Sequence, residues 1–160
     1  MGSESTLVEV KIGALIMDPN TNTPIVVLKG VENDTVLPIW VGAFEANAIA
    51  LEIEKIEPQR PMTHDLLRNV ITACGLSPSR VIVTDLLENT FYAQIELFDA
   101  NGALMTLDSR PSDAIALALR LDCPIFVEQK VLDLSATSNQ VEPEPDESSP
   151  STEDWPDLIG

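Results

Sequence analysis

The chain has 160 residues and a mean hydropathy of +0.10, which suffices to bury one core and argues against two independent domains. Its formal charge is −17, from 26 acidic and nine basic residues, which excludes the usual basic type of nucleic-acid-binding protein. No apolar stretch approaches the roughly 18 residues that a membrane helix needs, and the first residues are polar, so we expect a cytoplasmic protein without a membrane span.

The negative charge is concentrated at the carboxyl-terminal end. From Asp133 onward there are eight acids and no base, so the preceding residues, with 18 acids against nine bases, carry −9. This end is rich in Ser, Glu, Asp and Pro, a composition that cannot offset the entropy lost on ordering. We therefore predict a domain over residues 1–132 and an acidic disordered tail over 133–160, which shields a phosphate-binding groove or recruits a basic partner.

The first part of the chain has the composition of strands. Residues 7–17 and 25–29 are rich in Val, Ile and Leu and are separated by a polar break, which predicts two paired strands. The run 36–41 predicts a third strand, and its internal Pro38 suits an edge or bulge because proline donates no ladder hydrogen bond.

Two amphipathic helices are expected next. Apolar residues at helical spacing predict a helix from Gly42 to about Glu57. Thr63 is the expected N-cap of a second helix, and Gly75 the residue that ends it. The apolar face expected to enter the core in this second helix consists of Leu67, Val70, Ile71 and Cys74. Cys123, the other cysteine, is also expected in the core, and no CxxC spacing suggests zinc.

Strands dominate the remainder. We expect strands over 80–86, 91–98 and 103–107, with the last two joined by a turn at Asp99-Ala100-Asn101-Gly102. Pro111 suits the first position of a third helix, 112–121, and a short strand follows at 125–127. Strands in groups, with helices between the groups, predict an α+β single domain with mixed, largely antiparallel sheets packed with about three helices.

Three segments together resemble the bifunctional nuclease domain family. They are Leu37-Pro38-Ile39-Trp40-Val41-Gly42-Ala43-Phe44-Glu45-Ala46, Arg60-Pro61-Met62-Thr63-His64-Asp65-Leu66-Leu67, and Asp108-Ser109-Arg110-Pro111-Ser112-Asp113-Ala114-Ile115-Ala116-Leu117-Ala118. Their order and spacing match as well, so the resemblance covers about 7–132. It implies a homodimer with a broad groove as active site, acting on both RNA and DNA as substrates.

Asp108 and Asp113 flank the start of the third expected helix. Two carboxylates there suit a Mg²⁺ or Mn²⁺ ion that offsets phosphate repulsion and activates water. The positive end of the helix dipole favours the simpler role of Asp113 as a capping anion. Arg110 and Ser112, beside free backbone N–H groups, suit a phosphate contact, although Arg110 is equally suited to an ion pair with either carboxylate.

His64 is the only histidine and is suited to general acid–base catalysis near neutral pH. Its neighbour Asp65 points elsewhere on a helix, so a carboxylate from another segment would have to orient it. Asp65 itself is expected to complement the helix dipole. Glu45, in the first turn of its helix, is either a dipole partner or a groove-facing site residue. Arg60 suits either a phosphate contact or a loop anchor.

Two functions follow. The first is a metal-assisted nuclease of low sequence specificity, with Glu45, His64, Asp108 and Asp113 catalytic and Arg60, Arg110 and Ser112 binding substrate. The alternative is a noncatalytic oligomeric assembly or ligand-binding module, whose matched motifs serve folding and a subunit interface.

Overall fold

The computed structural model describes residues 6–138 as seven strands and four helices. The strands are β1 Leu7–Met17, β2 Pro24–Gly30, β3 Val36–Trp40, β4 Ser77–Leu87, β5 Thr90–Phe98, β6 Leu104–Ser109 and β7 Ile125–Glu128. The helices are α1 Ala43–Ile53, α2 Thr63–Ala73, α3 Pro111–Leu121 and α4 Gln129–Ser138. The predicted α+β class is confirmed.

All seven strands belong to one sheet, in the order β3-β2-β1-β7-β4-β5-β6. Strands β1 to β3 form one antiparallel group and β4 to β6 another, and β7 joins them, antiparallel to β1 and parallel to β4. The prediction of a largely antiparallel arrangement is therefore confirmed. Pro38 lies in β3, an edge strand, so its missing N–H does not interrupt the hydrogen bonds between central strands.

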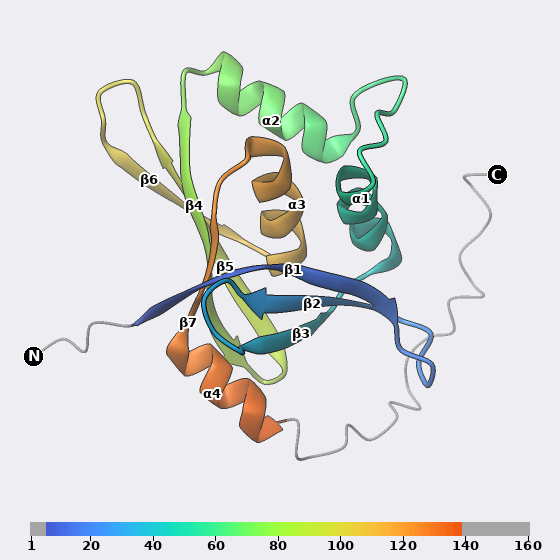
Figure 1. Cartoon of the computed structure of the whole chain (residues 1–160). Helices are drawn as coiled ribbons and strands as arrows, with labels where there is room; N and C mark the ends of the chain where they lie inside the picture. The colour runs from blue at the N-terminus through green and yellow to red at the C-terminus, as the bar shows by residue number, and fades with distance from the viewer. Residues whose placement is uncertain (1–5, 139–160) are drawn as a thin grey trace, which may run out of the picture.

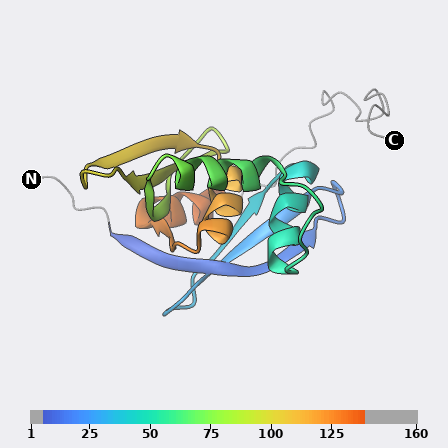
Figure 2. The same cartoon turned by 90° about the horizontal axis from the view of Figure 1, so that it is seen from above.

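Three helices cover one face of the sheet and α4 covers the other (Figure 1). Helix α3 is central and packs against α1, α2 and β5. Its run of five buried residues, Ala114 to Ala118, is mostly alanine, and these small side chains let the neighbouring helices approach closely. Seen from above, α2 and α3 lie between β1 and β6 (Figure 2). The site-bearing segments named above thus meet around α3.

Several local predictions are confirmed in detail. Gly75 has a φ of 73° and ends α2, where its N–H donates to the Thr72 carbonyl. The turn at 99–102 joins β5 to β6, with Asp99 Oδ1 accepting hydrogen bonds from the backbone N–H groups of Asn101 and Ala103. Pro111 is the first residue of α3, as its fixed φ favours.

The predicted end of the first helix and the predicted N-cap of the second helix were both wrong by a few residues. Helix α1 ends at Ile53 rather than near Glu57, because Lys55 adopts a left-handed conformation (φ 56°) and the Ile56 N–H turns back to the Leu51 carbonyl. The N-cap of α2 is Met62 rather than Thr63. Asp65, the third residue of α2, helps to cap the helix, because its carboxylate accepts a hydrogen bond from the Met62 N–H.

Helix α4 was not predicted, and it crosses the expected domain boundary between residues 132 and 133. Val131 is fully buried, so α4 packs as part of the domain. The rest of the predicted tail, 139–160, lies outside the described residues. Within 6–138, no helix is both long enough and apolar enough to cross a membrane.

The expected apolar face of α2 is the largest departure from prediction. Only Ile71 is buried, whereas Leu67 is 43% and Val70 47% exposed. Cys74 is exposed, so the expectation that it enters the core was wrong, whereas Cys123 is partly buried and packs against the core. This face of α2 is apolar, yet the domain does not cover it.

Candidate functional site

The first turns of three helices converge on one cluster of charged side chains. Each of these helices carries an acid at its third residue: Glu45 in α1, Asp65 in α2 and Asp113 in α3. A carboxylate at this position offsets the partial positive charge of a helix N-terminus. In two of the three helices the carboxylate also reaches across to a neighbouring helix and joins the site described below.

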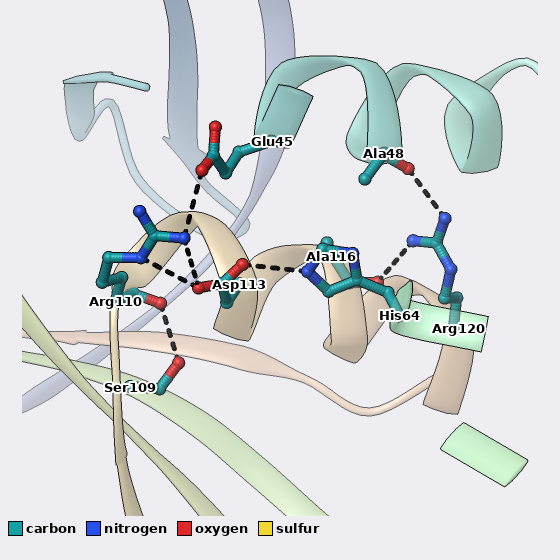
Figure 3. A network of polar contacts seen from close by, with 8 residues as sticks. All are labelled: Glu45, Ala48, His64, Ser109, Arg110, Asp113, Ala116 and Arg120. Carbon is teal, nitrogen blue, oxygen red and sulfur yellow. Dashed lines mark hydrogen bonds and ion pairs between the residues drawn. The ribbon is translucent and has the colours of Figure 1, made fainter. Parts of the chain in front are cut away.

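Four side chains form a continuous network, here called the quartet: Glu45, His64, Arg110 and Asp113 (Figure 3). His64 Nε2 lies 2.9 Å from Asp113 Oδ1. The other oxygen of Asp113, Oδ2, accepts a hydrogen bond from Arg110 Nε at 3.0 Å and forms an ion pair with Nη2 at 2.9 Å. Arg110 Nη2 also lies 3.1 Å from Glu45 Oε1. The quartet therefore links α1, α2 and the start of α3.

The structure supplies the orienting carboxylate that sequence reasoning required for His64. Asp113, from a helix far along the chain, makes the bond, and the adjacent Asp65 does not. A histidine whose Nε2 faces a carboxylate is held in the tautomer that donates Nε2–H, which leaves the Nδ1 lone pair free.

Side-chain exposure increases from His64 through Asp113 to Arg110, whereas Glu45, at the other end of the quartet, is 18% exposed. His64 has a side-chain exposure of 11%, Asp113 of 30% and Arg110 of 66%. Within residues 6–138 the His64 side chain makes one hydrogen bond, from Nε2 to Asp113, so Nδ1 is left as an acceptor in a side chain that is 11% exposed. The cluster thus offers solvent both a proton acceptor and an exposed guanidinium.

Two neighbouring carboxylates stabilise the charge of Arg110. The hydrogen bond and charge of Asp113, and then the charge of Glu45, raise the pKa of its guanidinium above the ordinary value. The three N–H groups on Nε and Nη2 are used in the quartet, whereas the two on Nη1 make no contact among the described residues. Arg110 therefore keeps donors for a further anion.

Asp65 has the structural role that the sequence favoured. Its Oδ2 accepts the Met62 N–H at 3.0 Å, and its Oδ1 accepts from Arg120 Nε at 2.8 Å. Burial opposes its ionisation, but the Met62 hydrogen bond and the Arg120 bond and charge outweigh that effect and lower the pKa of the Asp65 carboxyl.

Three predicted site residues lie outside the quartet. Asp108 is exposed and lies opposite Gln94 in the pairing of β5 with β6, while the alternate residues Ile95 and Leu97 enter the core beneath α3. Strand alternation therefore directs Asp108 to the face away from Asp113. Arg60 is exposed in the segment between α1 and α2, and Ser112 is only 7% exposed.

The quartet as arranged does not fit a divalent cation. Both oxygens of Asp113 are already engaged, one of them by a cation, and Asp108 points to the other face. No group of three or more His, Cys, Asp or Glu side chains within residues 6–138 is placed to hold a metal ion. A cation at Asp113 would have to replace Arg110 or His64 as its partner.

Two contributors to the site were not singled out from the sequence. A Cβ built on Gly42 would clash with Glu45 Oε2, so glycine leaves the space into which that carboxylate folds. Arg120 is buried at the far end of α3. A lone base on the otherwise apolar, alanine-rich face of α3 was the available signal for it.

Comparison with known proteins places the site in a family context. A Mycobacterium tuberculosis protein, described as uncharacterized, is 45% identical over 124 residues, which cover 78% of this chain and 73% of that protein. Bifunctional nuclease 1 of Oryza sativa is 26% identical over 125 residues, 77% of this chain and 38% of the plant protein. Bifunctional nuclease 1 of Arabidopsis thaliana is 30% identical over 108 residues, 65% of this chain and 33% of the plant protein.

The family model for the bifunctional nuclease domain matches residues 26–140. This range includes all four members of the quartet and every helix that carries them. It also includes the three sequence segments that carried the resemblance. The chain therefore belongs to the bifunctional nuclease domain family.

Proposed function

We propose that this protein is a nuclease of low sequence specificity that hydrolyses phosphodiester bonds in RNA and DNA at the quartet. The observation that carries the proposal is the pairing of His64 with Asp113 beside the exposed Arg110, which combines an oriented imidazole with an anion contact. Family membership and the names of the plant relatives support the substrate class. Aromatic residues make up only 4% of the chain, and the nine basic residues form no run interleaved with them, which favours low sequence specificity.

The chemistry follows from the donors and acceptors of the quartet. His64 Nδ1 accepts a proton from the attacking water as its oxygen bonds to phosphorus, and Asp113 stabilises the imidazolium that forms. The free Nη1 donors of Arg110 bind a nonbridging phosphate oxygen, where charge develops. The bond to the leaving oxygen breaks, and the imidazolium returns its proton to that oxygen. Because water is the nucleophile, the 2′-hydroxyl of RNA is not needed.

The acidic charge of the domain is offset locally. The first turns of α1, α2 and α3 each place backbone N–H groups and a partial positive charge near the quartet. Glu45 and Asp113 share a single arginine, so the cluster is held together by one cation and a histidine that gains a proton during the reaction. Tight binding of long duplexes is not expected from so few bases.

The proposal is tested by cleavage of labelled RNA and DNA oligonucleotides with Mg²⁺, with Mn²⁺ and with EDTA. The sequence predicted that a metal ion assists the reaction. We keep this prediction only in the form that a metal ion replaces Arg110 or His64 as the partner of Asp113. Cleavage that is equally fast in EDTA and with added metal would show that no metal ion is needed and would support the His64 mechanism alone. Loss in EDTA with recovery on adding metal would support the exchange at Asp113. No cleavage of either nucleic acid under any condition would contradict the proposed function and favour the noncatalytic assembly role.

We also propose that the protein is a homodimer, formed through the exposed apolar residues of α2 and β6. This surface, the α2/β6 face, consists of Leu66, Leu67, Val70, Met105 and Leu107, which are 37–58% exposed. Met105 and Leu107 lie opposite the core residues of β5, so they point to the side of the sheet that bears α2. Strand β6 is also an edge whose outer backbone groups no described strand pairs. A second copy of the chain, presenting the same surface, would cover the apolar side chains and pair with the free backbone groups of β6.

Replacing Leu67 and Val70 together by Asp should convert the dimer to a monomer. Burying two carboxylates per subunit without partners costs several kcal/mol, so the dimer dissociation constant should rise by at least about 100-fold. Sedimentation equilibrium measures the change. Val36→Asp, at an exposed apolar position on the opposite edge strand, is the matched control. A wild-type monomer, or an unchanged dimer in the double variant, would rule out this interface.

A further inference from the structure

Arg120 ties together the three helices that carry the site. Its side chain is 2% exposed, and the guanidinium bonds to an acceptor on each helix. Nη2 donates to the Ala48 carbonyl of α1 at 3.0 Å, Nε to Asp65 of α2 at 2.8 Å, and Nη1 to the Ala116 carbonyl of its own helix, α3, at 2.9 Å. Figure 3 shows the contacts to Ala48 and Ala116 to the right of the quartet.

The acceptors stand close in sequence to the quartet. Ala48 is one helical turn after Glu45, Asp65 directly follows His64, and Ala116 is three residues after Asp113. Each helix therefore meets Arg120 within one turn of the residue it contributes to the site. Movement of any helix relative to the other two would change a quartet distance and an Arg120 hydrogen bond together.

Only an arginine can make these three contacts at once. The guanidinium is planar and presents donors in several fixed directions, whereas a lysine ammonium is a compact charge on a flexible stem. Without the guanidinium, the buried carbonyl of Ala48 would lose this additional donor, and the largely buried Asp65 would lose its cationic partner and keep only the Met62 N–H. The three contacts therefore require the fixed donor directions of a guanidinium, which lysine does not offer.

We infer that Arg120 is a positioning residue that holds His64, Asp113 and Glu45 at their working separations. The expected effect of Arg120 on the cleavage rate rests on the proposed function. Its expected effect on the hydrogen bond between His64 and Asp113 does not. Arg120 itself lies too deep to contact a substrate. A displacement of about 1 Å between reacting groups can lower a rate by about 10²-fold, so a residue that sets these distances has a large effect on turnover.

The test compares the wild-type chain with Arg120→Lys. His64 is the only histidine, so ¹⁵N-histidine labelling gives one unambiguous Nε2–H signal, which reports the bond to Asp113 without any assay of cleavage. We expect this signal to shift and to exchange with solvent at least about tenfold faster in the variant. In cleavage assays kcat should fall by about 10²-fold and KM should stay within about threefold, because Arg110 still binds phosphate.

Asp65→Asn is the second variant and keeps the inference testable if Arg120→Lys does not fold. The amide oxygen still accepts the Met62 N–H, but the ionic contact to Arg120 is lost, so the same changes should appear to a smaller degree. Arg80→Lys is the matched control, since Arg80 pairs with Glu96 of β5 and stacks on the Phe126 ring of β7.

The outcomes separate the inference from the proposed function. An altered His64 signal supports the positioning role even where the wild-type chain cleaves nothing. A folded Arg120→Lys or Asp65→Asn variant with the wild-type signal would overturn it, whatever its activity. Changes of equal size in Arg80→Lys would also overturn it, because they would show a general loss of stability.

Discussion

Replacing His64 by Gln is expected to lower the cleavage rate by about 10³-fold, within the range that a positioned general acid–base group contributes. The glutamine amide can still donate to Asp113, so the quartet keeps its shape while the proton acceptor is lost. The rate is measured under single-turnover conditions with saturating protein, which separates the chemical step from binding and release.

Thermal unfolding of the same preparation is the control for this variant. His64 is 8% exposed, and a side chain of similar size that keeps one hydrogen bond should change stability little. A folded His64→Gln protein that cleaves RNA and DNA at the wild-type rate would remove His64 from the mechanism.

Asp113→Asn should lower the rate by about 10²-fold to 10³-fold and should also weaken substrate binding. The amide cannot stabilise the imidazolium, and it releases Arg110 from one of its two carboxylate partners. Asp108→Asn is the informative comparison, because Asp108 lies on the other face of the sheet and its loss should change the rate by less than about threefold. The reverse order of effects would favour the metal pair Asp108 and Asp113 over the quartet.

The sequence predicted most of the elements because their signals are local. Gly75 ends α2 through its own backbone freedom, and Pro111 begins α3 through its own ring, whatever the rest of the chain does. Helix α4 was missed because its polar composition resembles that of the tail, and its order comes from tertiary contacts of residues such as Val131 with the sheet.

The site was predictable in part. Its residue types and the need for a distant carboxylate beside His64 followed from the sequence, but the identity of that carboxylate depends on how α2 packs against α3. That Asp108 lies away from the quartet could not be predicted for a similar reason. Whether a strand residue faces a site depends on pairing register, and a shift of one residue reverses the face.

The apolar face of α2 illustrates a different limit. Its spacing correctly indicated one apolar stripe, which carries Leu67, Val70 and Ile71. The same spacing cannot say whether the covering surface comes from the chain itself or from another copy. Exposure in the structure was needed to separate Ile71, in the core, from its two neighbours on the α2/β6 face.

The measurement that tests the central claim most directly is a double-mutant cycle between His64 and Asp113 in single-turnover cleavage. If the two side chains act as one unit, adding Asp113→Asn to His64→Gln should slow cleavage by much less than Asp113→Asn does alone, because the second change then removes only the support that Asp113 gives to Arg110. Effects that multiply, or cleavage that survives in the double variant at the wild-type rate, would contradict a nuclease site built on the quartet.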